Sequence, residues 1–185
     1  MGTKALWVLT GVVGVLFLIQ AGVSVHIGAF FHDRGLSLTL VATAITINGI
    51  VNAIASLVWG AMIERIPVRW AMGILMVITA GSTIALLGVH SVTMAFIVSA
   101  VIGIVGSGGN VIPPVAYASY FGRSSIGNIR GVGETGVQIG QTIGPVLSGL
   151  AFDINGSYQV AFLTFAVLAL MGAGLISFSK PPNAL

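Results

Sequence analysis

Charged side chains are missing over long stretches of this chain, and this constrains its fold more than any other feature. Between Trp70 and Gly122 there is no Asp, Glu, Lys or Arg. Only 6% of the 185 residues are charged and 56% are hydrophobic, whereas a soluble domain carries about 25% charged residues. A soluble fold this apolar could not cover its surface with polar groups. The sequence therefore predicts an all-α membrane protein whose surroundings are a lipid bilayer.

Charged and turn-forming residues divide the chain into six apolar segments. The dividing segments are 32–35, 64–69, 88–91, 122–128 and 153–156, and Lys180 with two prolines follows the last segment. A membrane crossing takes about 20 apolar residues. We therefore expect one transmembrane domain over residues 1–185. Its helices are expected at about 5–30, 38–62, 70–88, 92–118, 129–151 and 157–178.

Six crossings distribute the basic residues very unevenly between the two sides of the membrane. Arg34 is alone on one side, and the other side holds Lys4, Arg65, Arg69, Arg123, Arg130 and Lys180. Basic residues accumulate on the cytoplasmic side. We therefore expect a multi-pass plasma (inner) membrane protein with both ends in the cytoplasm.

The scattered basic residues and the absence of cysteine argue against several classes of partner. The Lys and Arg residues are scattered singly, so no nucleic-acid surface is expected. Cysteine is absent, which excludes disulfides and thiolate metal sites. We expect neither a metal nor a cofactor.

Polar side chains concentrate on four of the six predicted segments. Amides that face lipid are costly, so these faces must meet other helices or a wet cavity. They could line a substrate path, or they could form hydrogen bonds between helices, each worth about 1 kcal/mol. The candidates for a substrate path are Gln20, His26, Asn48, Asn52, Asn110, Glu134, Gln138 and Gln141.

The order of polar and plain segments repeats. Two polar segments and one plain segment occur, and then the same order occurs again. This pattern matches the 3+3 inverted repeats of transporter halves. The two plain segments, the third and the sixth, could face lipid because their Ser and Thr hydroxyls can bond to their own helix.

Glu134 and His26 each have two interpretations. Glu134 could be a proton-coupling or substrate-facing carboxylate, or it could pair with Arg130 or Arg123 near the membrane interface. His26 could be a protonatable gate, or a hydrogen-bonded histidine that packs between helices.

Glycines and prolines cluster in the fourth and fifth segments. In the fifth, Gly136, Gly140 and Gly144 form a stripe that lets another helix approach closely. In the fourth, glycines precede two prolines, so this segment could be a hinge for alternating access or could simply pack closely. The residues concerned are Gly103, Gly106, Gly108, Gly109, Pro113 and Pro114.

The segment from Gly60 to Arg69 resembles the loop signature of the major facilitator superfamily, Gly-x-x-x-Asp-Arg-x-Gly-Arg-Arg/Lys. Gly60, Arg65 and Arg69 match, Glu64 replaces the aspartate, and residues 67 and 68 depart from the pattern. The resemblance implies that Gly60, Glu64, Arg65 and Arg69 form a cytoplasmic gate. The alternative is that these charges only set the orientation.

Further segments extend this resemblance over nearly the whole chain. Residues 120–123, 129–131, 144–145, 149, 152–153, 156–158 and 161–162 look like the last six helices of monocarboxylate-porter-like and oxalate/formate-antiporter-like members. The resemblance implies the C-terminal half of a fold with about twelve helices. The missing N-terminal six-helix half, or a second copy of this chain, would then be the partner.

The resemblance also implies secondary active transport of a small solute, such as an organic anion of the monocarboxylate class, by alternating access. No Lys or Arg is predicted in mid-membrane, so the cation for such an anion would come from the other half. The alternative is a non-transporting truncated remnant or a membrane assembly subunit. An enzyme is not expected, because no Gly-x-Ser-Gly occurs and no pair of carboxylates shares the membrane.

Overall fold

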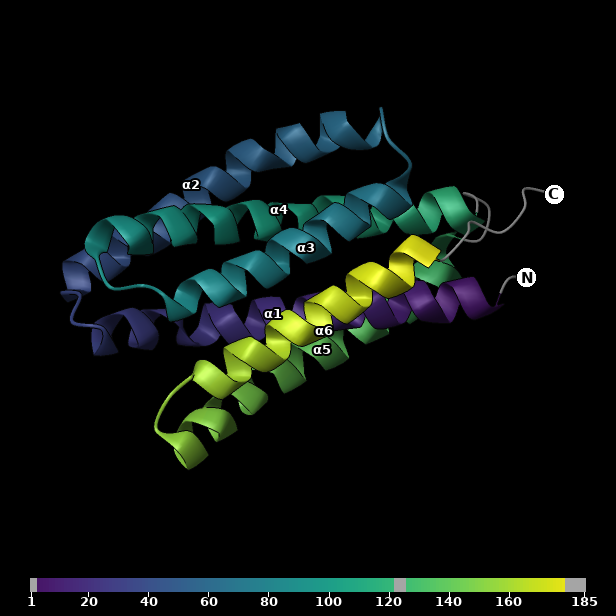
Figure 1. Ribbon diagram of the computed structural model, residues 1–185. Helices are drawn as coiled ribbons and strands as arrows, with labels where there is room; N and C mark the ends of the chain where they lie inside the picture. The colour runs from purple at the N-terminus through teal and green to yellow at the C-terminus, as the bar shows by residue number, and fades with distance from the viewer. Residues whose placement is uncertain (1–2, 122–125, 179–185) are drawn as a thin grey trace.

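The computed structural model describes residues 3–121 and 126–178, which form six helices (Figure 1). They are α1 (Thr3–Asp33), α2 (Leu38–Ile63), α3 (Val68–Leu87), α4 (Val92–Phe121), α5 (Ile126–Asn155) and α6 (Gln159–Phe178). Short turns join α1 to α2 and α5 to α6. Gly35 and Gly156 have φ angles of 88° and 65° there, a conformation that glycine adopts at little cost.

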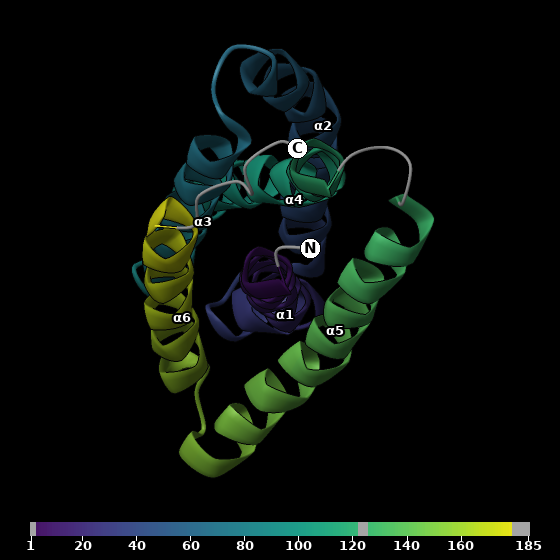
Figure 2. The ribbon, with the colours of Figure 1, turned by 90° about the vertical axis from the view of Figure 1, so that its right-hand side faces the viewer.

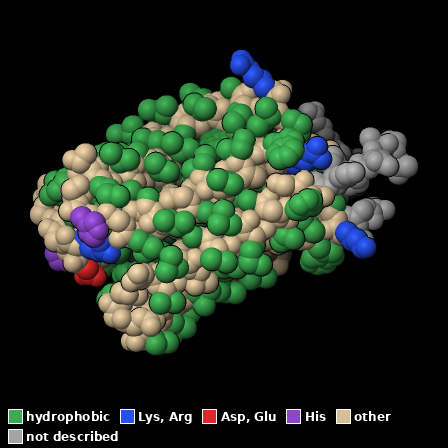
Figure 3. All heavy atoms as spheres, viewed as in Figure 1, with side chains coloured by type: hydrophobic (Ala, Val, Ile, Leu, Met, Phe, Trp, Pro, Cys, Tyr) green, Lys and Arg blue, Asp and Glu red, His purple; other side chains and the backbone are tan. Residues whose placement is uncertain are grey.

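The helices run back and forth, so the beginning of α1 and the end of α6 lie at the same end of the bundle (Figure 1). We call this the termini end. On the face drawn in Figure 3, Lys and Arg side chains lie mainly toward the termini end, basic and acidic side chains lie together with His at the opposite end, and hydrophobic side chains spread over the middle. In the described residues, five helices are long and apolar enough to cross a membrane. The exception is α5, which carries Glu134, Gln138 and Gln141.

Helix pairing shows an internal repeat. α1 packs along α5, α2 packs along α4, and α3 packs along α6. If α1, α2 and α3 correspond to α4, α5 and α6, the α1–α5 pair corresponds to the α4–α2 pair, and the α3–α6 pair corresponds to itself. Because α4 runs opposite to α1, the two repeats are inverted. The predicted fold class, an all-α membrane protein with 3+3 inverted repeats, is confirmed.

α3 and α6 pack on each other along one side of the bundle (Figure 2). The buried hydroxyls of Thr79, Ser82 and Thr83 on α3 donate to carbonyls of their own helix. Apolar side chains cover the outer surface of both helices, namely Ile74, Val77, Ile84, Leu163, Val167 and Leu170. This surface is suited to contact with lipid.

The glycine stripe of α5 lies directly against the backbone of α1. A Cβ atom on Gly144 would touch the Leu18 carbonyl oxygen and lie 2.9 Å from the Gly22 nitrogen. A Cβ atom on Gly140 would touch the Gly14 carbonyl oxygen in the same way. The predicted close approach of another helix is therefore confirmed, and that helix is α1.

We predict that Gly144→Ala destabilises the protein by about 1–3 kcal/mol, because the added methyl group meets backbone atoms that cannot move aside. Gly81→Ala on α3 is the control, since a Cβ atom there meets nothing within 4 Å. The control should be neutral, or more stable by up to about 1 kcal/mol. Thermal unfolding of the detergent-purified variants, followed by tryptophan fluorescence, measures both. Equal melting temperatures would contradict the close packing.

Candidate functional site

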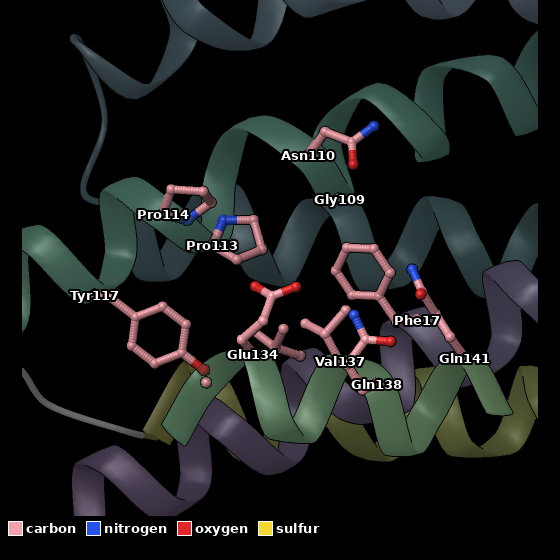
Figure 4. Close-up of a pocket in the computed structure, with 12 residues that line it drawn as sticks. Phe17, Gly109, Asn110, Pro113, Pro114, Tyr117, Glu134, Val137, Gln138 and Gln141 are labelled. Carbon is pink, nitrogen blue, oxygen red and sulfur yellow. The ribbon is translucent and has the colours of Figure 1, made fainter. Parts of the chain in front are cut away.

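A cavity of about 270 Å³ opens between α1, α4 and α5 (Figure 4). Phe17 of α1 and Asn110, Pro113 and Tyr117 of α4 form part of its wall. Opposite them, α5 contributes Glu134, Val137, Gln138 and Gln141. The Glu134 carboxylate points from α5 toward Pro113 of α4 in Figure 4. The cavity therefore combines one carboxylate and several amides with apolar side chains.

A second cavity of about 470 Å³ is bounded by α1, α2, α4 and α5. It shares Phe17, Asn110 and Gln141 with the first cavity, so the two form one polar face of the bundle. Gln20, Asn48 and Asn52 also line the second cavity. Among the described residues, none from α3 or α6 lines either cavity.

Two of the cavity amides also connect helices. Gln20 Nε2 of α1 donates to the Val105 carbonyl of α4 at 3.0 Å. Asn48 Nδ2 of α2 donates to the Ser99 carbonyl of α4 at 3.2 Å. The two interpretations of these amides are therefore compatible, because the same side chain bonds between helices and contributes to the cavity wall.

The glycines of α4 provide the space that these amides need. A Cβ atom on Gly109 would collide with the Gln20 side-chain amide. A Cβ atom on Gly106 would lie 2.5 Å from Asn52 Nδ2. Close packing thus accounts for both glycines, and α4 continues as a helix through Pro113 and Pro114.

Prolines add acceptors to the same polar face, which the sequence interpretation missed. Proline has no N–H, so in a helix it leaves the carbonyl four residues earlier without its usual donor. Pro113, Pro114 and Pro145 lie inside α4 and α5, and the carbonyls concerned belong to Gly109, Asn110 and Gln141. All three of these residues line the cavities. In a membrane such carbonyls are tolerated where a wet cavity can satisfy them. Counting four residues back from each helical proline would have revealed this pattern.

Glu134 is exposed toward the first cavity. Its neighbour Gly133 leaves room for the ring of Tyr117, whose hydroxyl donates to Thr10 Oγ1 at 3.2 Å. The alternative partners of Glu134 fall outside the described part of the chain. They are Arg123 and the side chain of Arg130.

His26 does not line the two cavities and lies toward the opposite end of the bundle from the termini. Its Nε2 is 3.0 Å from the Pro145 carbonyl, and its Nδ1 is 3.2 Å from the Tyr158 hydroxyl. A carbonyl only accepts, so Nε2 carries the proton and Nδ1 accepts from Tyr158. The ring links α1 to α5 and to the start of α6, as a packing histidine would.

An aromatic cluster surrounds the partner of His26. The Tyr158 ring stacks on Phe152 and Phe162, with ring centroids 4.6 and 5.8 Å apart. Burial raises the pKa of the Tyr158 phenol, and the carboxylates of Asp33 and Asp153 raise it further. Tyr158 therefore stays a neutral donor to His26 at physiological pH.

The candidate gate residues lie at the termini end and do not line either cavity. Glu64 follows Ile63, the last residue of α2, as its C-terminal cap, and Arg65 is exposed in the turn that follows. Arg69 lies in the first turn of α3, with its guanidinium 5.5 Å from the centre of the Trp70 ring. A Cβ atom on Gly60 would meet nothing within 4 Å. Of the basic residues that predict the orientation, Arg123 and Lys180 lie outside the described residues.

Comparison with known proteins gives one family. The family model described as Major Facilitator Superfamily matches residues 6–184. Among curated proteins, none matches the chain.

Proposed function

We propose that this chain carries out secondary active transport of a small solute together with a second six-helix half. The chain belongs to the Major Facilitator Superfamily. Membership in this family supports a multi-pass membrane transporter rather than an enzyme. Alternating access with a partner, the class of solute and the roles of individual residues are our proposal.

The observation that carries the proposal is the exposed polar face between α2 and α5. Asn110, Glu134, Gln138 and Gln141 are exposed in the isolated chain and line the cavities of α1, α2, α4 and α5. Polar groups of this kind do not face lipid. A second layer of helices that covers this face would enclose the cavities as a solute path.

The apolar rims of the polar face support a helical partner. α2 exposes Ile45, Ile50, Ile54, Leu57 and Val58, and α5 exposes Ile139, Ile143, Val146, Leu147 and Leu150. These helices lie on different sides of the cavities (Figure 2). We propose that an N-terminal six-helix half, or a second copy of this chain, packs on α2 and α5.

We propose an organic anion of the monocarboxylate class as the solute, from the resemblance of the sequence to porters for such anions. Among the described residues that line the two cavities there is no Lys or Arg. Their amides can donate hydrogen bonds to a carboxylate, but the full positive charge must come from the second half. In this proposal the path is lined by Gln20, Asn48, Asn52, Asn110, Glu134, Gln138 and Gln141. His26 holds the end of α1 beside α5.

In the same proposal, the segment with Gly60, Glu64, Arg65 and Arg69 acts as the gate. Gly108, Gly109, Pro113 and Pro114 are the candidate hinge of α4, since prolines remove helical hydrogen bonds there. A Cβ atom on Gly108 would lie 2.7 Å from Leu75 Cδ1 and 2.9 Å from Trp59 Cε2. Movement at Gly108 therefore requires α4 to shift against α2 and α3.

Uptake of radiolabelled lactate, formate and oxalate by cells that express the chain with its natural neighbouring sequence tests the function. Gln138→Ala should lower the apparent affinity for the transported acid about tenfold, because a lost hydrogen bond in a closed site costs about 1–2 kcal/mol. Thr164→Ala is the control, since within residues 3–121 and 126–178 its hydroxyl bonds to Val160 of its own helix and to no other residue. Loss of uptake in the control but not in Gln138→Ala would contradict the assigned path. Failure to take up any of these acids would overturn the organic-anion assignment and favour the remnant or the assembly subunit.

We also propose that the termini end faces the cytoplasm, from the uneven distribution of Lys and Arg. His90 lies in the turn between α3 and α4, and Glu64 lies at the other end of the bundle. In intact cells, an impermeant maleimide should label His90→Cys and should label Glu64→Cys only after permeabilisation. The opposite result would place the termini outside.

A further inference from the structure

A third cavity, separate from the proposed solute path, lies at the termini end of the bundle. It measures about 470 Å³ and is formed by the end of α2, the first turn of α3 and the last turns of α4. Its wall consists of Ile63, Ile66, Pro67, Val68, Arg69, Ser119 and Tyr120. We call it the α2–α4 end pocket.

Two polar atoms in this pocket are buried without a hydrogen-bond partner in the described structure, Arg69 Nε and the Tyr120 hydroxyl. The Arg69 nitrogen is a donor only, and the tyrosine hydroxyl can donate. A buried donor left unpaired costs about 1–3 kcal/mol. Buried groups of this kind call for an explanation such as a bound ion.

The first turn of α3 adds further donors on the same side. α3 begins at Val68, directly after Pro67, which provides no side-chain hydrogen bond to cap the helix. The first N–H groups of a helix lack partners within it and form the positive end of its dipole. Arg69 in this turn adds its positive charge to that end of the dipole, and anions are favoured near a helix N-terminus.

No side-chain carboxylate in the described wall of the pocket balances the positive charge of Arg69. Neither Asp nor Glu is among the described residues that line it. Ser119 uses its hydroxyl to donate to the Ala116 carbonyl of its own helix. The wall thus offers a guanidinium, a phenol and a helix N-terminus, which together suit a phosphate group.

We propose that the α2–α4 end pocket binds the phosphate group of an anionic phospholipid. The apolar side chains of Ile63, Ile66 and Val68 suit the glycerol and the first acyl carbons. The Trp70 side chain beside Arg69 is 48% exposed, and such amphipathic rings favour the headgroup level. Basic pockets between membrane helices are known to hold lipid phosphates. The lipid would connect α2, α3 and α4 at the end where the gate segment lies.

The test uses the full chain in nanodiscs of phosphatidylcholine, with or without phosphatidylglycerol, and measures the melting temperature. Phosphatidylglycerol should raise the melting temperature of the unmodified protein by about 2–4 °C. Arg69→Gln should lose this rise, and Tyr120→Phe should lose a part of it. The matched control is Arg65→Gln. Arg65 carries the same charge and lies four residues before Arg69, but it does not line the pocket.

The outcomes separate the possible sources of the effect. A full rise in the unmodified protein and in Arg65→Gln, with a smaller rise in Tyr120→Phe and none in Arg69→Gln, supports the pocket. A rise that persists in Arg69→Gln and Tyr120→Phe, or that falls equally in Arg65→Gln, overturns it in favour of general surface attraction. Inorganic phosphate added to phosphatidylcholine discs is the third arm. If inorganic phosphate raises the melting temperature as much as phosphatidylglycerol does, and this rise also requires Arg69, the phospholipid is overturned as the ligand. If Arg69→Gln does not fold, Tyr120→Phe alone decides.

Discussion

The backbone contact between α1 and α5 is the interaction on which the rest of the structure depends. Lipid is as apolar as leucine, so burial does not drive membrane helices together, and close packing has to do so. Gly140 and Gly144 allow α5 to lie on the backbone of α1 at Gly14 and Leu18. The same contact turns the neighbouring face of α5, with Glu134, toward α4. In the equivalent pair of α4 and α2, Gly103 of α4 also lies against backbone, since a Cβ atom there would be 3.1 Å from the Asn52 nitrogen of α2.

With these two contacts the six helices form two groups. α1, α2, α4 and α5 surround the polar cavities, and α3 and α6 pack on each other beside them. Amides such as Gln20 and Asn48 have two roles within the first group of helices, since they bond to α4 and line the cavities. The carbonyls that lose their helical donor to a proline belong to residues that line the same cavities. In the isolated chain this polar face is exposed, and lipid does not satisfy such groups, which supports our proposal that a second half covers it.

Much of the fold could be predicted from the sequence. A polar side chain that faces lipid costs free energy, so the polar faces of the helices must point toward other helices or a cavity. The repeat of polar and plain helices predicted the fold, and the glycine stripe predicted a close helix neighbour. The stripe could not identify that neighbour, since α1 and α4 both carry glycines. His26 was grouped with the cavity residues, but its place depends on Pro145 and Tyr158, which lie more than 100 residues away in the chain. The α2–α4 end pocket requires Arg69 and Tyr120, which are distant in the sequence, to line the same cavity. No local sequence pattern predicts this.

The central claim is that the face of α5 with Gln138 lines a wet cavity, whereas the outer face of α6 meets lipid. The chain has no cysteine, so single cysteines report their own surroundings. Thiols react as thiolates, which form in water and not in lipid. In nanodiscs, a water-soluble methanethiosulfonate should modify Gln138→Cys rapidly and Leu170→Cys, which is 51% exposed on α6, hardly at all. Equal rates at the two positions, or faster modification of Leu170→Cys, would contradict the account.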